Sequence, residues 1–180
     1  LIPVEDLRSY LNGNHSLGKS CHITIDDGDR TFYEVIYPVL KKHGIPATLF
    51  VSPEIIAEGK CYWFQEISQF DSSSFKKTIA NYLDLDAERI KKYNTIQICK
   101  TLKISQIYDL INLYKAQFNH VTRMNQNLTL DQLRAINIDN LISIGAHTLT
   151  HPILANEDDA VSEHEIKESL KGLRDILGND

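Results

Sequence analysis

The hydrophobic positions along the chain predict short strands separated by amphipathic helices. Apolar residues recur at helical spacing over residues 4–11 and again over 32–43. Runs rich in β-branched residues at 21–26 and 47–51 indicate buried strands. A strand, a helix and a strand within about 30 residues predict a parallel βαβ unit. The apolar face of the second helix comprises Phe32, Val35, Ile36, Val39 and Leu40, with Pro38 as a possible kink.

The pattern changes in the middle of the chain, from about residue 60 to 138. This segment is polar, rich in Lys and Asn and helical in pattern, and we interpret it as a helical insertion. A third short strand is predicted at 141–145, and a further helix follows it. Ser162, with Glu165 three positions later, has the pattern of a capping box at the start of that helix. Its predicted apolar face comprises Ile166, Leu170, Leu173 and Leu177. The predicted fold class is α/β with parallel strands.

Three acidic side chains follow the first predicted strand, in the stretch CHITIDDGD. Asp26, Asp27 and Asp29 lie within four positions of one another. Like charges this close disfavour ionisation unless something positive lies between them. A polar turn with Gly28 at positive φ would explain the pattern equally well. Ligands of parallel sheets bind beyond the carboxyl ends of the strands, which favours a functional site here.

Two histidines follow the third predicted strand, in the stretch GAHTLTHP. His147 and His151 are four positions apart, so a helical turn would place them on one side, whereas Pro152 favours a loop. Such a pair alone is more often structural or solvent-facing. Two histidines and a distant carboxylate supply three ligands, the number that leaves one position of a catalytic zinc site open to water. The acidic residues and the two histidines each follow a predicted strand of a parallel sheet, so they should meet at the same edge of the sheet. The sequence therefore favours one metal site that both groups share.

Composition and charge narrow the classes of partner. The 180 residues carry a net charge of −5, which argues against nucleic acid or an anionic membrane as the main partner. No run approaches the length of about 18 apolar residues that a membrane span needs, and no signal-peptide pattern opens the chain. Localisation therefore stays open between the cytoplasm and the cell envelope. The three cysteines are far apart and odd in number, so a disulfide framework is not expected.

Two motifs together resemble those of a known family. TIDDG at residues 24–28, followed by HTLTHP at 147–152, is similar to the first two motifs of the NodB-homology polysaccharide deacetylases, carbohydrate esterase family four. The family patterns are T-F/Y-D-D-G and H-S/T-x-x-H-P, and Ile25 replaces the usual aromatic residue. The resemblance implies an incomplete, distorted (β/α) barrel. It also implies a hydrolase that removes acetyl groups from a polysaccharide or sugar, with N-acetyl favoured over O-acetyl.

The resemblance also implies a role for individual residues. Asp26 would be the general base, and Asp27, His147 and His151 would bind a metal ion whose water attacks the acetyl carbonyl. Zinc is the first expectation, although cobalt, nickel and manganese suit the same ligands. The cation would make an ionised Asp27 tolerable beside Asp26. Thr148 and Thr150 lie between the two histidines. They could orient the site through hydrogen bonds, but we favour the interpretation that they cap the next helix or face solvent.

The later motifs of the family are not found in the chain. These are an Arg-x-Pro motif that orients the base, an acidic-Trp motif, and a Leu-x-His motif whose histidine acts as general acid. The resemblance therefore covers the N-terminal part of one NodB-homology domain over residues 1–180, either as a fragment or as a protein that has lost its acid. The expected partner is an acetylated glycan. Exposed strand edges of an incomplete barrel would also favour self-association into a homo-oligomer.

Two other functions stay open. The stretch DGDRT fits the D-x-D-x-T motif of haloacid-dehalogenase-like phosphatases, with Asp27 as nucleophile, Asp29 as acid/base and Mg²⁺ between them. That interpretation leaves the two histidines without a role. The second alternative is a catalytically incomplete domain that binds glycan or belongs to an assembly. Its candidate sugar-stacking residues are Tyr62, Trp63 and Phe64, for which a place in the core is favoured.

Overall fold

The structure is a computed structural model that describes residues 1–123 and 126–178. The chain divides into two compact units. The first comprises Leu1–Lys60, Gln126–Thr150 and Glu165–Asp180, and the second comprises Cys61–Asn125 and His151–His164. Within the described ranges, none of the helices combines the length and hydrophobicity that a bilayer crossing requires.

Three parallel strands form the sheet of the first unit, in the order β1-β2-β3. They are β1 (Ile23–Ile25), β2 (Ala47–Val51) and β3 (Ile142–Ala146). In the register, Thr48 of the central strand pairs with Thr24 on one side and Ser143 on the other. The predicted α/β class with parallel strands is confirmed, and each strand lies within one residue or two of its predicted position. Because the strands are parallel, their carboxyl ends meet at one edge of the sheet.

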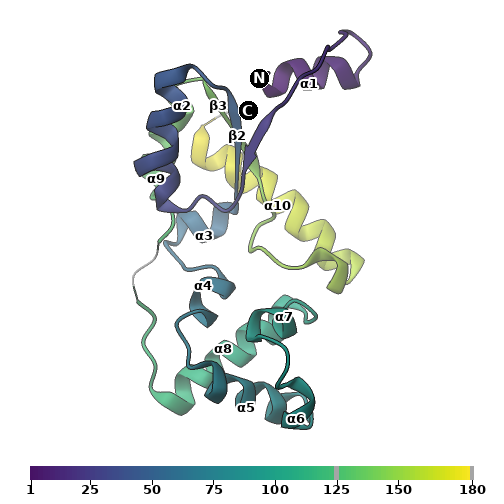
Figure 1. The fold of residues 1–180 in the computed structure, drawn as a ribbon, viewed down its shortest axis with the longest axis vertical. Coiled ribbons are helices and arrows are strands. Elements are labelled where there is room, and N and C mark those ends of the chain that lie inside the picture. The colour runs from purple at the N-terminus through teal and green to yellow at the C-terminus, as the bar shows by residue number, and fades with distance from the viewer. Residues whose placement is uncertain (124–125, 179–180) are drawn as a thin grey trace. The chain divides into compact units, whose positions relative to one another are not determined.

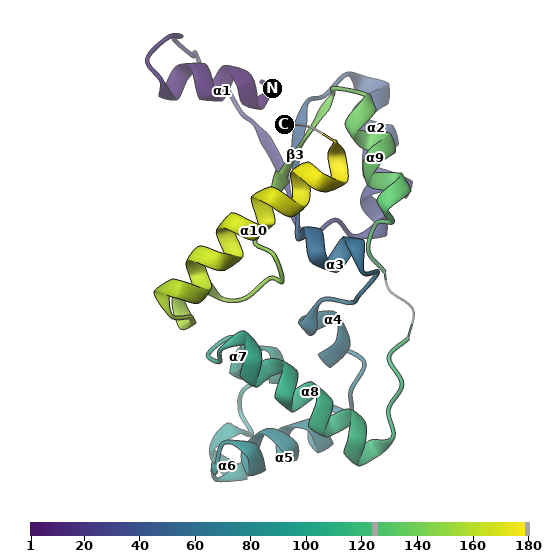
Figure 2. The same cartoon turned by 180° about the vertical axis from the view of Figure 1, so that it is seen from behind.

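Helices cover both faces of this sheet. α2 (Tyr37–His43) and α9 (Leu130–Ile138) lie beside one face, and α10 (Asp159–Leu177) crosses the other (Figures 1 and 2). The first unit also contains α1 (Val4–Leu11) and α3 (Pro53–Ala57). The core between these layers is apolar and includes Phe32, Leu49, Val51, Leu133, Ile136 and Leu173. Burial of these side chains fixes the strands, and hence the segments that leave their carboxyl ends.

The helix predicted over residues 32–43 is present, but its buried face differs from the predicted one. Phe32–Ile36 form a π-helical segment that continues directly into α2, and Pro38 lies at the start of α2. Phe32 and Leu40 are buried as predicted. The prediction is wrong for three residues that are exposed, namely Val35, Ile36 and Val39. The π-helical segment turns Tyr33 and Tyr37 toward the core instead.

The second unit is helical and has its own core. It contains α4 (Trp63–Ile67), α5 (Ser72–Tyr82), α6 (Ala87–Ile90), α7 (Thr95–Cys99) and α8 (Ile104–Phe118), with a 3-10 turn at Leu154–Asn156. The core includes Trp63, Phe75, Ile79, Ile107 and Leu110, all buried. The helical character predicted for residues 60–138 agrees with these elements, whereas α9 belongs to the unit that holds the sheet.

Helix α10 departs from its predicted start and face. It begins at Asp159, so Ser162 lies inside the helix and its N–H donates to the carbonyl of Asp158 at 2.9 Å. The capping box predicted for Ser162 and Glu165 is therefore wrong. The buried residues of this helix are Glu165, Ser169 and Leu173, while Ile166 and Leu170 of the predicted face are exposed. Two of these three buried residues are polar. The apolar residues of the sequence therefore predicted a buried face of α10 that lies next to the face that is buried in the structure.

Candidate metal centre

The chain leaves β1 in a tight turn that carries the acidic residues. Asp27 and Gly28 both adopt left-handed conformations, with φ of 70° and 68°, and the N–H of Gly28 donates to the carbonyl of Asp26 at 2.9 Å. A Cβ on Gly28 would lie 2.9 Å from Cγ1 of Val51, so this position requires glycine both for its φ and for its contact. The turn predicted from Gly28 is present, and it carries Asp27 toward the strand ends.

Residues 126–128 form hydrogen bonds that hold this turn in place. The N–H of Leu128 donates to the carbonyl of Gly28 at 2.8 Å, and the N–H of Arg30 donates to the carbonyl of Gln126 at 2.7 Å. Between them, Asn127 is fully buried and its amide donates to the carbonyl of Lys60 at 3.1 Å. The two backbone bonds join residues about 100 positions apart in the chain and the Asn127 bond joins residues 67 apart, and no motif in the sequence pointed to them.

The three acids of the turn lie in different environments. The carboxylate of Asp29 accepts hydrogen bonds from the N–H of Thr31 at 2.8 Å and from its hydroxyl at 2.6 Å. It thus caps the helical turn that follows, as N-cap aspartates do. Asp26 is exposed, whereas Asp27 is half-buried and near His147. Asp29 therefore has a structural partner in Thr31, whereas the phosphatase interpretation pairs its carboxylate with that of Asp27 through Mg²⁺.

His147 is placed by continuation of the sheet beyond β3. Its N–H donates to the carbonyl of Val51 at 2.8 Å, and its own carbonyl accepts from the hydroxyl of Ser52 at 2.8 Å. These bonds fix the backbone at the strand end. Nε2 of His147 then lies 3.5 Å from Oδ1 of Asp27. The predicted convergence of the two strand ends is present for this pair.

The segment from His147 to His151 is a loop, as Pro152 indicated, and Glu165 of α10 holds it. One carboxyl oxygen of Glu165 accepts from the N–H of Leu149 at 2.8 Å and of Thr150 at 2.9 Å. The other accepts from the hydroxyl of Thr150 at 2.6 Å. Thr150 therefore neither caps the helix nor faces solvent, and the favoured interpretation of that residue is wrong. The hydroxyl of Thr148 donates to the adjacent carbonyl of His147.

His151 is surrounded by aromatic rings. The indole N–H of Trp63 donates to the carbonyl of His151 at 3.0 Å. The rings of Tyr62 and Phe64 meet the imidazole edge-on, with centroids 5.1 and 5.4 Å away. Tyr62 and Trp63 are fully buried, so their faces are not available to a sugar ring, and the favoured interpretation of these residues as core holds.

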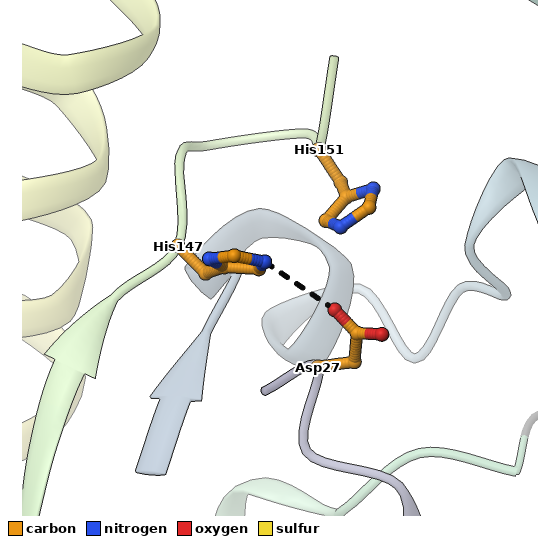
Figure 3. Close-up of side chains that lie close together, drawn as sticks. All are labelled: Asp27, His147 and His151. Carbon is orange, nitrogen blue, oxygen red and sulfur yellow. Dashed lines mark ion pairs between the residues drawn. The ribbon is translucent and has the colours of Figure 1, made fainter. Parts of the chain in front are cut away.

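Asp27, His147 and His151 come together as a group. Each offers one ligand atom, and these atoms all lie within 4.8 Å of one another (Figure 3). Among the described residues, no other group of three His, Cys, Asp or Glu side chains meets that criterion.

The chemistry of this group, and the spacing of one pair within it, suit a metal ion. Ligand atoms about 2.1 Å from a tetrahedral zinc ion lie about 3.4 Å from each other. The 3.5 Å between Asp27 and His147 is close to that spacing and longer than a charge-assisted hydrogen bond. Two imidazole nitrogens with one carboxylate oxygen form a ligand set that zinc and related divalent ions take.

The chain belongs to the polysaccharide deacetylase family, because the sequence model of that family matches residues 13–180. The family resemblance of the two motifs is thereby confirmed. Among curated relatives, the poly-β-1,6-N-acetyl-D-glucosamine N-deacetylases of Staphylococcus aureus strains MSSA476 and N315 are each 30% identical over 110 residues. These alignments cover 55% of this chain and 38% of each relative, so the chain spans well under half the length of those proteins.

Solved structures share the fold. The deacetylase PplD of Streptococcus pyogenes, determined with acetate, has a TM-score of 0.54 and 21% identity, and the match covers 99% of this chain and 50% of that one. The deacetylase domain of BpsB from Bordetella bronchiseptica has a TM-score of 0.53 and 14% identity, covering 98% and 59%. The expected (β/α) architecture of the deacetylases is confirmed by this likeness.

Proposed function

We propose that Asp27, His147 and His151 bind one divalent metal ion, zinc first among the candidates, in a hydrolase that removes acetyl groups from a polysaccharide. The observation that carries the proposal is the approach of three ligand atoms to within 4.8 Å in a chain of the polysaccharide deacetylase family. An ion held by them would supply Lewis acidity toward an acetyl carbonyl and toward water.

The chain's own residues supply binding, orientation and a base. His147 is oriented by the backbone bonds to Val51 and Ser52, and Asp27 by the turn that Gly28 allows. Asp26, next in the chain to Asp27 and exposed to solvent, is the proposed general base that accepts the proton of the attacking water. Its exposure makes it accessible to water.

The proposed substrate is a polymer of N-acetylglucosamine, with N-acetyl groups favoured over O-acetyl esters. The curated Staphylococcus aureus relatives act on poly-β-1,6-N-acetyl-D-glucosamine, and that chemistry supports the same class of substrate here. The alternative of a glycan-binding domain without catalysis drew on the aromatic side chains at residues 62–64. Since Tyr62 and Trp63 are fully buried, only the partly buried ring of Phe64 is left to support that alternative.

Acetate release from a β-1,6-linked N-acetylglucosamine oligomer tests the proposal. The assay uses the 180-residue chain and, in parallel, the longest natural form of the protein that contains it, each loaded with Zn²⁺ or Co²⁺. We expect metal-dependent release by the longest natural form, and we expect residues 1–180 on their own to bind metal and release little acetate, because the family's later histidine motif is not found among them. Asp26→Asn should lower release at least about 100-fold without changing metal content.

Two outcomes would contradict the proposal. Release that survives complete removal of metal by a chelator would exclude the metal-assisted reaction. Glycan binding by the longest form, unchanged by Asp26→Asn and without any acetate release, would instead favour the non-catalytic alternative. A fluorogenic acetate ester assayed beside the oligomer separates O-acetyl from N-acetyl preference.

A further inference from the structure

Glu165 is a buried acid whose hydrogen bonds all go to the loop between the two histidines. Its side chain is 4% exposed, and a carboxyl group in such a place is costly unless its oxygens accept hydrogen bonds. Here it accepts two from backbone N–H groups and one from a hydroxyl, at Leu149 and Thr150. One side chain thus fixes two of the three residues between His147 and His151.

The loop that Glu165 holds is a strained one. Thr148 and His151 have φ of 63° and 66°, in the left-handed region that residues with a Cβ seldom adopt. Such conformations persist where the surroundings over-determine them, and they gather at functional sites. At its start the loop is held by the sheet, through the bonds of His147 to Val51 and Ser52. Between the histidines, Glu165 of α10 holds the loop through its bonds to Leu149 and Thr150.

We infer that Glu165 is a positioning residue of the metal centre, which holds the loop in the conformation that lets His147 and His151 bind the same ion. The inference rests on the proposed function, since it concerns the ligands named there. Glu165 bonds the backbone and one hydroxyl of the loop, so it acts through the loop. Partners of this kind, one step behind the ligands, commonly change metal affinity by about 10–100-fold when they are replaced.

Four variants separate positioning from general stability. Glu165→Ala removes all three hydrogen bonds to the loop. Glu165→Gln keeps an oxygen that can accept from both backbone N–H groups, and its amide can donate to the hydroxyl of Thr150. Thr150→Val removes only the hydroxyl bond. Ser169→Ala is the matched control, because Ser169 is buried one turn further along the same face of α10 and its hydroxyl donates to the carbonyl of Ile166, within the helix.

The test measures Zn²⁺ affinity by competition with a chromophoric chelator, beside the thermal unfolding of the metal-free protein. We expect Glu165→Ala to weaken Zn²⁺ binding by about tenfold or more. Thr150→Val should weaken it by about threefold to tenfold, the equivalent of one hydrogen bond. Glu165→Gln should restore affinity to near the wild-type value. Ser169→Ala should lower the unfolding temperature and leave affinity unchanged.

Hydrogen exchange of the amides of Leu149 and Thr150 in the metal-free protein gives a readout that needs no metal. Both should exchange faster in Glu165→Ala than in the wild type or Ser169→Ala. A folded Glu165→Ala variant with wild-type affinity would overturn the inference. So would a Glu165→Gln variant as weak as Glu165→Ala, and, if Glu165→Ala does not fold, wild-type affinity in Thr150→Val. A wild type that binds no Zn²⁺ would instead overturn the proposed function, and the exchange rates would still decide whether Glu165 holds the loop.

Discussion

Nε2 of His147 lies 3.5 Å from Oδ1 of Asp27, although the two residues follow strands that are not neighbours in the sheet. Asp27 follows β1 and His147 follows β3, with β2 between them. Two local features close this gap. The left-handed turn at Asp27 and Gly28 carries the carboxylate across the end of the central strand, and the bond from His147 to Val51 keeps the imidazole at that end.

Gly28 is the position where this turn is most sensitive to substitution. Gly28→Ala places a Cβ 2.9 Å from the side chain of Val51 in addition to straining a φ of 68°. We expect it to lower the free energy of unfolding by about 1–3 kcal/mol more than Gly13→Ala does, as overpacking commonly costs. Gly13 is the matched control because its φ is 74° and a Cβ there would have no atom within 4 Å. Urea unfolding of both variants measures the difference, and equal losses would show that the contact with Val51 is unimportant.

Asp26 and Asp29 should differ in what their replacement removes. Asp29→Ala removes the bonds to Thr31 and should cost about 1 kcal/mol of stability, typical of a lost N-cap, while metal content and acetate release persist. Asp26→Asn should leave stability and metal content unchanged and remove most of the acetate release. Acetate release and unfolding free energy of the two variants, measured side by side, check this. Loss of all activity in Asp29→Ala, together with phosphatase activity in the wild type, would favour the phosphatase interpretation.

The three cysteines should differ in reactivity. Cys21 is exposed, whereas Cys61 and Cys99 are buried. Burial raises the pKa of the Cys99 thiol to about 12, and it also raises the pKa of Cys61. At neutral or mildly alkaline pH we therefore expect Ellman's reagent to modify Cys21 rapidly in the native protein and all three cysteines in denaturant. Rapid modification of Cys99 without denaturant would contradict the packing around α7.

The raised pKa of Cys99 also predicts how stability depends on pH. The folded-state pKa of about 12 exceeds the ordinary value of 9.0, so the unfolded chain loses this proton first as the pH rises. The contribution of Cys99 is therefore fully present below about pH 9, and it declines as the pH rises from there toward about 12. Unfolding free energies measured across this range should fall less steeply in Cys99→Ala than in the wild type. Cys21→Ala, at an exposed position, should leave the slope unchanged.

The sequence could predict the strands and the fold class from local patterns, and the resemblance of two motifs to a family selected the three candidate ligand residues. The strands are short β-branched runs, and the candidate ligands follow them directly. The partners of the site could not be predicted in the same way. In the sequence, Glu165 has the spacing of a helix-capping residue, and Trp63 resembles an ordinary core aromatic residue. Their hydrogen bonds to the loop depend on how α10 and α4 pack, which the sequence pattern does not reveal. A buried polar side chain has no distinct periodicity, so its partner is found only in the fold.

Metal content of the purified protein is the most direct test of the central claim, measured by elemental analysis of the wild type, Asp27→Ala and His151→Ala. His43→Ala is the control, because His43 is an exposed histidine at the end of α2. The account predicts about one zinc-like ion per chain in the wild type and the control, and its loss in both ligand variants. A wild type that holds no metal after Zn²⁺ is supplied, or an ion that remains in Asp27→Ala and His151→Ala, would contradict it.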